Sequence, residues 1–219
     1  MTRRQFRHKL RRASFVPHRF IISFFRIKNM EWFKVNNIKN SVYAISEPYH
    51  WEDVRSYLFV GKDKAILIDT GTGLCPLKPT IDRLTELPIT VILTHCHWDH
   101  IGSINSFNEI YVHSEEENWL KNGIPIPIES IKNNITSRGY DYSKCPNFDI
   151  DKYTVPTKSG CNNLKGGETI SNGFHELEVI HTPGHSPGSI TLYERTLKIM
   201  VTGDLLYKGT IYANYPSTD

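Results

Sequence analysis

The sequence predicts one α/β or α+β domain, in which sheets of short strands are flanked by helices. Its 219 residues are enough for a single domain with a substantial core, and a second domain of similar size is not expected. The chain is 39% hydrophobic and 22% charged, as is usual for a globular protein. Short apolar runs rich in β-formers are interspersed with segments of helical spacing, which is the pattern of sheets covered by helices.

The first half of the domain is predicted to begin with strands. Three short runs of β-branched and aromatic residues have this character: 42–45, 57–60 and 64–69. A turn rich in Thr and Gly ends the last of them. Residues 77–87 have helical spacing, residues 90–94 form a further apolar strand, and a helix is expected to begin near Ile101.

The second half is predicted to contain a long insertion between strands. A strand at 110–113 is followed by Ser114 and Glu117, which are spaced as a capping box that opens a helix. Residues 125–163 read as a helix and then an extended surface segment with little periodicity. Strands are expected to resume in three places: 175–180, 189–193 and 198–202.

Residues 1–29 differ in charge from residues 30–219, which we take as the folded domain. They hold nine of the 26 Lys and Arg residues and no Asp or Glu, which leaves 17 basic against 23 acidic side chains in the domain. This basic leader could be a targeting peptide resembling a mitochondrial presequence, or a nucleic-acid-binding arm. Because the pattern of a folded domain already begins at Met30, we favour an upstream extension that is not part of the fold.

The sequence carries no sign of a membrane anchor or an oxidising compartment. The apolar run at 20–25 is too short to span a bilayer, and no small-residue cleavage site follows it. The cysteines are widely spaced and form no C-x-x-C pair: Cys75, Cys96, Cys145 and Cys161. We therefore expect a cytoplasmic protein with reduced thiols, in which Cys96 is a packing residue.

The most informative segment is Thr94–His100, which has the pattern H-x-H-x-D-H directly after a predicted buried strand. Extended backbone places alternate side chains on one side, so His95 and His97 can bind one zinc ion. Asp99 and His100 are adjacent and should diverge, unless the chain turns to aim both at a second ion. Imidazole nitrogen and carboxylate oxygen are the ligands that zinc takes when a water must stay bound.

Two later strand ends carry further candidate ligands. The turn after the strand at 175–180 holds His181 and His185 among Pro and Gly residues, which fix an unusual backbone path. Spacing alone leaves open which of these two histidines binds metal. Asp204 follows the strand at 198–202, where its carboxylate could bridge two cations about 3.5–4 Å apart.

Together these segments resemble the metallo-β-lactamase superfamily from about Trp32 to the end of the sequence. The resemblance implies an αββα sandwich with two zinc ions in the complete site. The ligands it implies are His95, His97 and His185 for the first metal, Asp99 and His100 for the second, and Asp204 as the bridge. Asp69 matches a family position that supports the site without binding metal, and His181 would lie outside the first shell of ligands.

The sequence departs from the family pattern after Asp204. The family has one more histidine beyond that segment, whereas only fifteen residues follow here and none of them is His. The resemblance therefore predicts a sandwich that is incomplete at its C-terminus, lacking the closing strand and helix. It also predicts one or two zinc ions per chain, with weak binding at the second site.

The function that the resemblance implies is hydrolysis of an acyl bond in a small molecule. Zinc lowers the pKa of a bound water and makes hydroxide available near neutral pH, so a thioester, lactone or lactam could be cleaved. Asp99 would be the catalytic residue that orients the nucleophile and takes up its proton. Within the superfamily the chain looks most like the small bacterial hydrolases near the hydroxyacylglutathione hydrolases and acyl thioesterases. The alternatives are a catalytically impaired metal-binding protein of the same fold and, less favoured, nucleic-acid binding through the leader.

Overall fold

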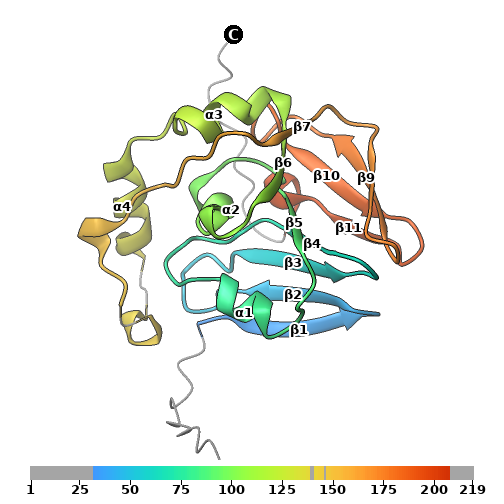
Figure 1. Cartoon of the computed structure of the whole chain (residues 1–219). Helices are drawn as coiled ribbons and strands as arrows, with labels where there is room; N and C mark the ends of the chain where they lie inside the picture. Colours follow the sequence, from blue (N-terminus) through green and yellow to red (C-terminus); the bar gives the residue numbers. More distant parts are fainter. Residues whose placement is uncertain (1–31, 139–140, 146, 208–219) are drawn as a thin grey trace, which may run out of the picture.

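The computed structural model describes residues 32–138, 141–145 and 147–207, and within them eleven strands form two sheets (Figure 1). The larger sheet contains, in spatial order, β1 (Lys34–Lys39), β2 (Val42–Ser46), β3 (Arg55–Val60), β4 (Ala65–Ile68), β5 (Ile89–Ile92), β6 (Glu109–His113) and β7 (Asn162–Leu164). The smaller sheet has the order β11 (Ile199–Val201), β10 (Ile190–Glu194), β9 (Glu176–His181) and β8 (Thr169–Ser171). The leader, residues 1–29, lies outside the described residues.

Alternate residues of the larger sheet face two different cores. On β3 and β4, Phe59 and Ile66 are buried against Leu177 and Leu192 of the smaller sheet, so the two sheets pack face to face. Leu58 and its neighbours on the opposite face are buried against the helices. This separation follows from the two-residue period of a strand, and it accounts for the fully apolar runs in the sequence.

Four short helices cover the outer face of the larger sheet (Figure 1). They are α1 (Lys78–Asp82), α2 (Trp98–Ile101), α3 (Glu117–Asn122) and α4 (Ile128–Ser137). Each contributes buried side chains to that core, for example Ile81 of α1, Ile101 of α2 and Ile131 of α4. The described residues therefore hold a helix layer and two sheet layers. None of the described helices has the length and apolar character that a bilayer span requires.

Strand direction brings several loops to one edge of the sandwich. Strands β4, β5 and β6 are parallel, so the segments that follow them emerge at the same edge. Strands β9 and β11 both run antiparallel to β10 and therefore end together. A backbone hydrogen bond from Ile190 N–H to Thr94 O, 2.9 Å long, joins the two sets of loops.

The insertion crosses this edge and is covalently attached to the larger sheet. Cys145 forms a disulfide with Cys75, which lies in the loop between β4 and α1. The prediction of four reduced thiols is therefore wrong, and only Cys96 and Cys161 are free. The two bonded cysteines are 70 residues apart, and nothing in their spacing indicates that the insertion folds back onto this loop.

Two predicted helix details are also wrong. The helix expected over residues 77–87 ends at Asp82. Pro88 disfavours helical backbone only in Leu87, the last residue of the expected range. The capping box at Ser114 does not form, because residues 114–116 are a 3₁₀ turn in which the Glu115 N–H is capped by the His113 ring. Glu117 instead accepts a 2.8 Å hydrogen bond from the Asn163 side chain.

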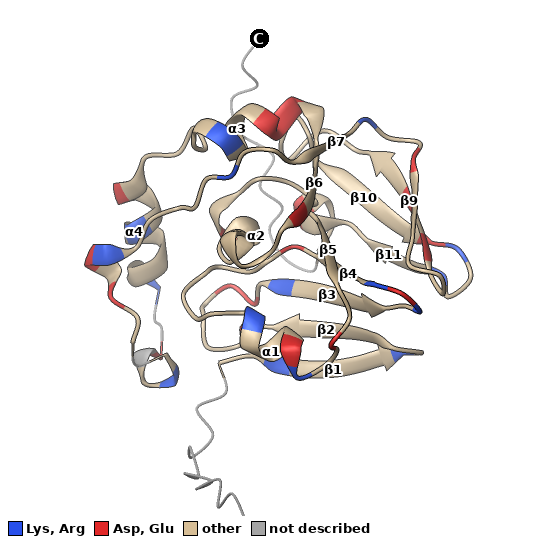
Figure 2. Cartoon of the chain, viewed as in Figure 1, with Lys and Arg blue, Asp and Glu red and all other residues tan. Residues whose placement is uncertain are grey.

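Figure 2 shows that charged residues are concentrated on helices and turns, while most of the strand surface is uncharged.

Three short strands, β1, β7 and β8, were not predicted from the sequence. Strand β1 lies at the edge of its sheet, and most of its side chains are exposed. Such strands lack the apolar alternation that identifies a strand in sequence.

Candidate metal centre

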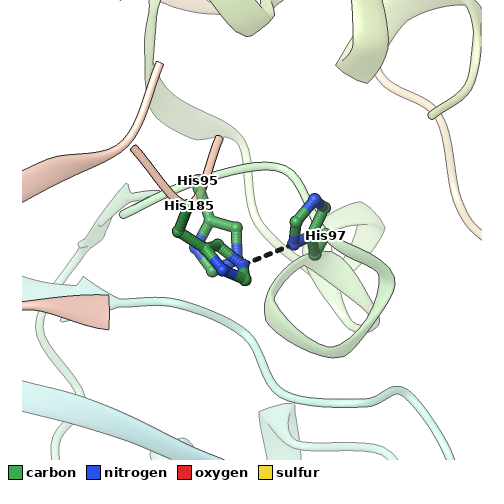
Figure 3. Close-up of side chains that lie close together, drawn as sticks. All are labelled: His95, His97 and His185. Atoms are coloured by element: carbon green, nitrogen blue, oxygen red, sulfur yellow. Dashed lines mark hydrogen bonds between the residues drawn. The ribbon is translucent and has the colours of Figure 1, made fainter. Parts of the chain in front are cut away.

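Three buried imidazoles converge at the edge where the loops meet. His95 and His97 lie in the loop between β5 and α2, and His185 lies in the loop between β9 and β10. One ring nitrogen from each lies within 4.8 Å of the others, and the ring centroids are 4.6 to 4.7 Å apart. Figure 3 shows the three side chains gathered in one place, with His185 Nε2 2.8 Å from His97 Nδ1. The structure thus brings together the three histidines of the implied first site.

The chemistry of these rings fits a zinc ion. Bonds of about 2.0–2.1 Å in a tetrahedral site put neighbouring ligand nitrogens roughly 3.3 Å apart. The three rings here offer nitrogens within 4.8 Å of one another, and one pair is 2.8 Å apart. His95 Nε2 is buried and has no hydrogen-bond partner among the described residues. Burial, together with the neighbouring imidazoles, lowers the pKa of His95 well below its usual value, and burial lowers that of His97 to about 4. Both rings are therefore neutral at pH 7, the form that binds metal.

The implied second site lies beside the first. His100 Nε2 is 3.2 Å from Asp204 Oδ1 and 3.5 Å from Asp99 Oδ2. The other oxygen of Asp204 is 3.7 Å from His185 Nε2, so this carboxylate faces both groups. His95, His100 and Asp204 also offer ligand atoms within 4.8 Å of one another. The carboxylate of Asp204 thus lies near ligand atoms of both groups.

Asp69 holds Thr94 and the His100 ring in place through hydrogen bonds. Its carboxylate accepts hydrogen bonds from Thr94 N–H at 2.8 Å and from Thr94 Oγ1 at 2.7 Å. It also lies 2.8 Å from His100 Nδ1, which leaves His100 Nε2 directed at Asp204. A carboxylate that holds one ring nitrogen in this way orients the other toward a metal.

The carboxylates of Asp69, Asp99 and Asp204 also determine the charge of His100. Burial alone would lower the pKa of His100, but Asp99, Asp204 and Asp69 around it raise that pKa well above its usual value. Burial raises the pKa of Asp99, but His100, His97 and a backbone hydrogen bond together outweigh it and lower that pKa to about 2. Asp99 is therefore ionised at neutral pH, as a metal-binding carboxylate must be.

Gly203 is required for Asp204 to reach this position. Its φ of +51° is in the left-handed region, and a Cβ added there would lie 2.6 Å from Thr94 Oγ1. A side chain at Gly203 would therefore push the strand end that carries Asp204 away from the Asp69–Thr94 contact.

Glu116 ties the two histidine loops together, and sequence reasoning missed it. Its buried carboxylate accepts a 2.5 Å hydrogen bond from Cys96 N–H, between His95 and His97. It also accepts hydrogen bonds from Ser186 Oγ and, at 2.9 Å, from Gly188 N–H, in the loop that carries His185. The one signal for Glu116 in the sequence is that it follows β6 closely, at the edge where the other site residues lie. The expected capping box involved its neighbours Ser114 and Glu117 and not Glu116 itself.

The remaining histidine of the Pro/Gly-rich turn lies apart from the cluster. His181 stacks on His113, with ring centroids 3.9 Å apart, and its Nε2 is 3.0 Å from Pro187 O. His181 belongs to neither group of converging ligands.

Cys96 is buried in the core, and burial followed by the charge of Glu116 raises its thiol pKa well above the usual value.

A cavity of about 640 Å³ opens beside the side chains of the implied second site. Its lining includes Asp99, His100 and Asp204. Its walls include Trp51 and Glu52, from the loop between β2 and β3, and Arg138 at the end of α4; sequence reasoning singled out none of these three. Burial, followed by the charges of Asp99 and Asp204, raises the pKa of Glu52 to about 7. This volume suits a small-molecule ligand.

Comparison with known families gives a match over most of the chain. The family model described as the metallo-beta-lactamase superfamily matches residues 50–218. The acyl-coenzyme A thioesterase MBLAC2 of Gallus gallus is 29% identical over 193 residues, which are 83% of this chain and 69% of that protein. The hydroxyacylglutathione hydrolase GloC of Haemophilus influenzae is 27% identical over 164 residues, covering 71% of this chain and 68% of that protein.

Solved structures agree in fold. The B3 metallo-beta-lactamase BLEG-1 has a TM-score of 0.52 at 23% identity, over 82% of this chain and 75% of that chain. A metallo-beta-lactamase family protein from Thermus thermophilus has a TM-score of 0.57 at 20% identity, over 80% of this chain and 63% of that chain. At these identities the likeness concerns the fold alone, and it confirms the fold class predicted from the sequence.

Proposed function

We propose that this chain, which belongs to the metallo-beta-lactamase superfamily, is a zinc-dependent hydrolase that cleaves thioesters of small molecules. The observation that carries the proposal is the convergence of three buried imidazoles beside a carboxylate that faces a second buried group. The cavity of about 640 Å³ next to them offers room for a small-molecule substrate.

The candidate ligands would form two metal sites, one for each group of converging side chains. One ion would be held by His95, His97 and His185, and the other by Asp99 and His100, with Asp204 between them. Zinc in such a site supplies a water of lowered pKa and polarises an acyl carbonyl. In this assignment Asp69 acts through His100, whose ring it holds in place.

Asp99 would accept a hydrogen bond from the attacking water and so orient it toward the acyl carbon. Its carboxylate is ionised and lines the cavity, where a bound substrate can be reached. Orientation of this kind removes much of the entropic barrier to attack.

Two considerations favour a thioester over the lactone and lactam that the same site could accept. The names of two relatives describe an acyl-coenzyme A thioesterase and a hydroxyacylglutathione hydrolase, and the substrates in both names are thioesters. In addition, a thiol has a pKa near 8.5, so a thiolate can leave without a proton from a general acid. An amine leaving from a lactam needs that proton.

The test is hydrolysis by the zinc-loaded protein of a matched panel containing a thioester, a lactone and a lactam, with metal content measured on the same sample. We expect turnover of the thioester, lost on chelation and restored by zinc. Faster turnover of the lactone or lactam would assign a different acyl bond. Zinc binding without turnover of any panel member would favour the alternative of a catalytically impaired metal-binding protein.

A further inference from the structure

Two chemically different sets of side chains line the cavity above the candidate metal centre. The apolar wall, as we call the first set, consists of the exposed side chains Met200 and Leu206, from β11 and the segment after it. The cationic wall consists of Trp51 and Arg138, which lies at the end of α4. The candidate metal ligands Asp99, His100 and Asp204 line the same cavity. A substrate that fills this space would therefore contact an apolar surface, the reacting centre and a cation.

Arg138 is held in a defined place. Its guanidinium carbon lies over the Trp51 ring, 4.5 Å from the ring centroid. The indole N–H of Trp51 donates a 3.1 Å hydrogen bond to Asn134 O on the same helix, which fixes the ring relative to α4. Stacking of this kind leaves the N–H groups at the edge of the guanidinium able to bind an anion in two parallel hydrogen bonds.

The charge of Arg138 is less compensated than that of Arg55, the other arginine of the cavity. Arg55 donates to Asp53 Oδ2 at 2.6 Å, so its charge is already paired. Over residues 32–138, 141–145 and 147–207, no carboxylate forms an ion pair with Arg138. Glu52 is near enough for Arg138 to lower its pKa, although no hydrogen bond joins them. Arg138 is thus the group in the cavity best placed to bind an anion.

We propose that the substrate is an acyl thioester of an anionic thiol carrier, with the carrier bound by Arg138 on Trp51 and the acyl chain lying along Met200 and Leu206. This inference rests on the proposed thioester hydrolysis. Two carriers share the required chemistry: the nucleotide thiol coenzyme A, with its phosphates, and the tripeptide thiol glutathione, with its carboxylates. In this proposal the thioester carbonyl lies next to Asp99, which lines the same cavity as both sets of side chains.

The kinetic test compares one acyl group on three thiols in the zinc-loaded protein: coenzyme A, glutathione and the neutral N-acetylcysteamine. For Arg138→Gln we expect KM to rise roughly 10-fold for the anionic thioester that is the substrate and to stay unchanged for the neutral one, since one charge-assisted contact is lost. The carrier with the larger rise is the natural one. Equal changes for all three thioesters, or none, would overturn the assignment.

Arg195→Gln is the matched control. Arg195 also lies over an aromatic ring, 5.6 Å from the centroid of Tyr193, but it does not line the cavity and is paired with Glu178. We expect no change in KM for any thioester in this variant. A second variant, Arg138→Lys, keeps the charge but not the planar fork, and should recover only part of the affinity.

Binding separates this inference from the proposed reaction. Calorimetry with desulfo-coenzyme A and S-methylglutathione, which lack a free thiol to bind zinc, needs no turnover. Tighter binding of either analogue to the wild-type chain than to Arg138→Gln, in a protein that hydrolyses no thioester, would sink the proposed reaction and leave the anion site standing. Equal binding to both proteins, or to neither, refutes the anion site whatever the activity.

A separate experiment tests whether the acyl chain lies along Met200 and Leu206. Leu206→Ser should raise KM more for a long acyl chain than for an acetyl group, because each buried methylene contributes to binding. A change that does not depend on chain length would contradict the orientation proposed here.

Discussion

The metal loops and the insertion lie at the same edge of the sandwich, but they are held there in different ways. The metal loops are the segments that carry the candidate metal ligands, residues 94–100, 182–188 and 202–204. Buried carboxylates fix the first two, since Asp69 makes three hydrogen-bond contacts with residues 94–100, and Glu116 makes three with residues 94–100 and 182–188. The insertion, residues 125–161, is attached by the Cys75–Cys145 disulfide, by the core residues Ile131 and Ile135 of α4, and by Tyr153, whose hydroxyl donates to Thr72 O at 2.9 Å.

The difference separates two properties of the site. Buried charged networks fix atoms to a fraction of an ångström and are costly to disturb. The insertion is held by a covalent link and by apolar packing of α4, and its exposed side chains can change without moving the metal ligands. We therefore expect metal affinity to depend on the carboxylates and substrate recognition to depend on the insertion.

The largest effect should come from removing a ligand within the metal loops. His185→Ala should weaken the tighter zinc more than 100-fold and abolish turnover, since even loss of an outer-shell partner costs about 10–100-fold. His181→Ala, four residues away and stacked on His113, is the control and should bind zinc normally. Competition with a chromophoric chelator measures both. A larger loss in His181→Ala would reverse the assignment of the two histidines.

A smaller loss of zinc should follow from changing the carboxylate behind the loops. Glu116→Gln replaces one acceptor oxygen by a donor, which then faces an N–H or hydroxyl that needs an acceptor. We expect zinc affinity to fall about 10–100-fold. The control is Glu194→Gln, another buried carboxylate, which accepts from Leu197 N–H and touches no metal loop. It should lower Tm and leave zinc affinity unchanged; similar zinc loss in both variants would remove the special role of Glu116.

Opening the disulfide should affect stability without affecting the metal. Cys75→Ser removes a link between residues 70 apart, and the unfolding free energy should fall by about 2–4 kcal/mol. Zinc affinity should stay within about twofold of the wild-type value, because the carboxylate network is untouched. Cys161→Ser, at a half-buried free thiol, serves as the control and should change neither quantity. Denaturant unfolding and a thiol count before and after reduction provide the measurements, and a large zinc loss on reduction would show that the two regions are coupled.

The smallest expected effect concerns Glu52, on the cavity wall between the two regions. In the metal-free protein, burial and the charges of Asp99 and Asp204 raise its pKa to about 7 from 4.5. The folded chain thus binds this proton more tightly than the unfolded chain, so the contribution to stability is complete below pH 4.5 and is lost as the pH rises through 7. Glu52→Gln should raise the Tm of the metal-free protein at pH 8 by about 2 °C relative to wild type, and by less at pH 5. A difference in Tm that is equal at both pH values would contradict this origin.

The same division explains what the sequence could predict. Fully apolar strands and the H-x-H-x-D-H pattern are local signals, and they indicated the fold and the residues that the structure brings together. Glu116 and the Cys75–Cys145 bridge depend on contacts between segments 70 or more residues apart, which no local pattern encodes. Arg138 acquires its place only through Trp51, 87 positions earlier in the sequence, and could not be distinguished from an ordinary surface arginine.

The disulfide divides the chain into a covalent ring, residues 75–145, and the segments on either side of it. His95, His97, Asp99 and His100 lie within this ring, whereas His185 and Asp204 lie beyond it. A metal ion held by both sets would therefore act as a second closure, joining the ring to the smaller sheet. A protease cut inside the ring would leave the fragments linked until a reductant is added. A cut between the ring and the smaller sheet would leave the two halves joined only by packing and by the metal, so that a chelator would promote their separation.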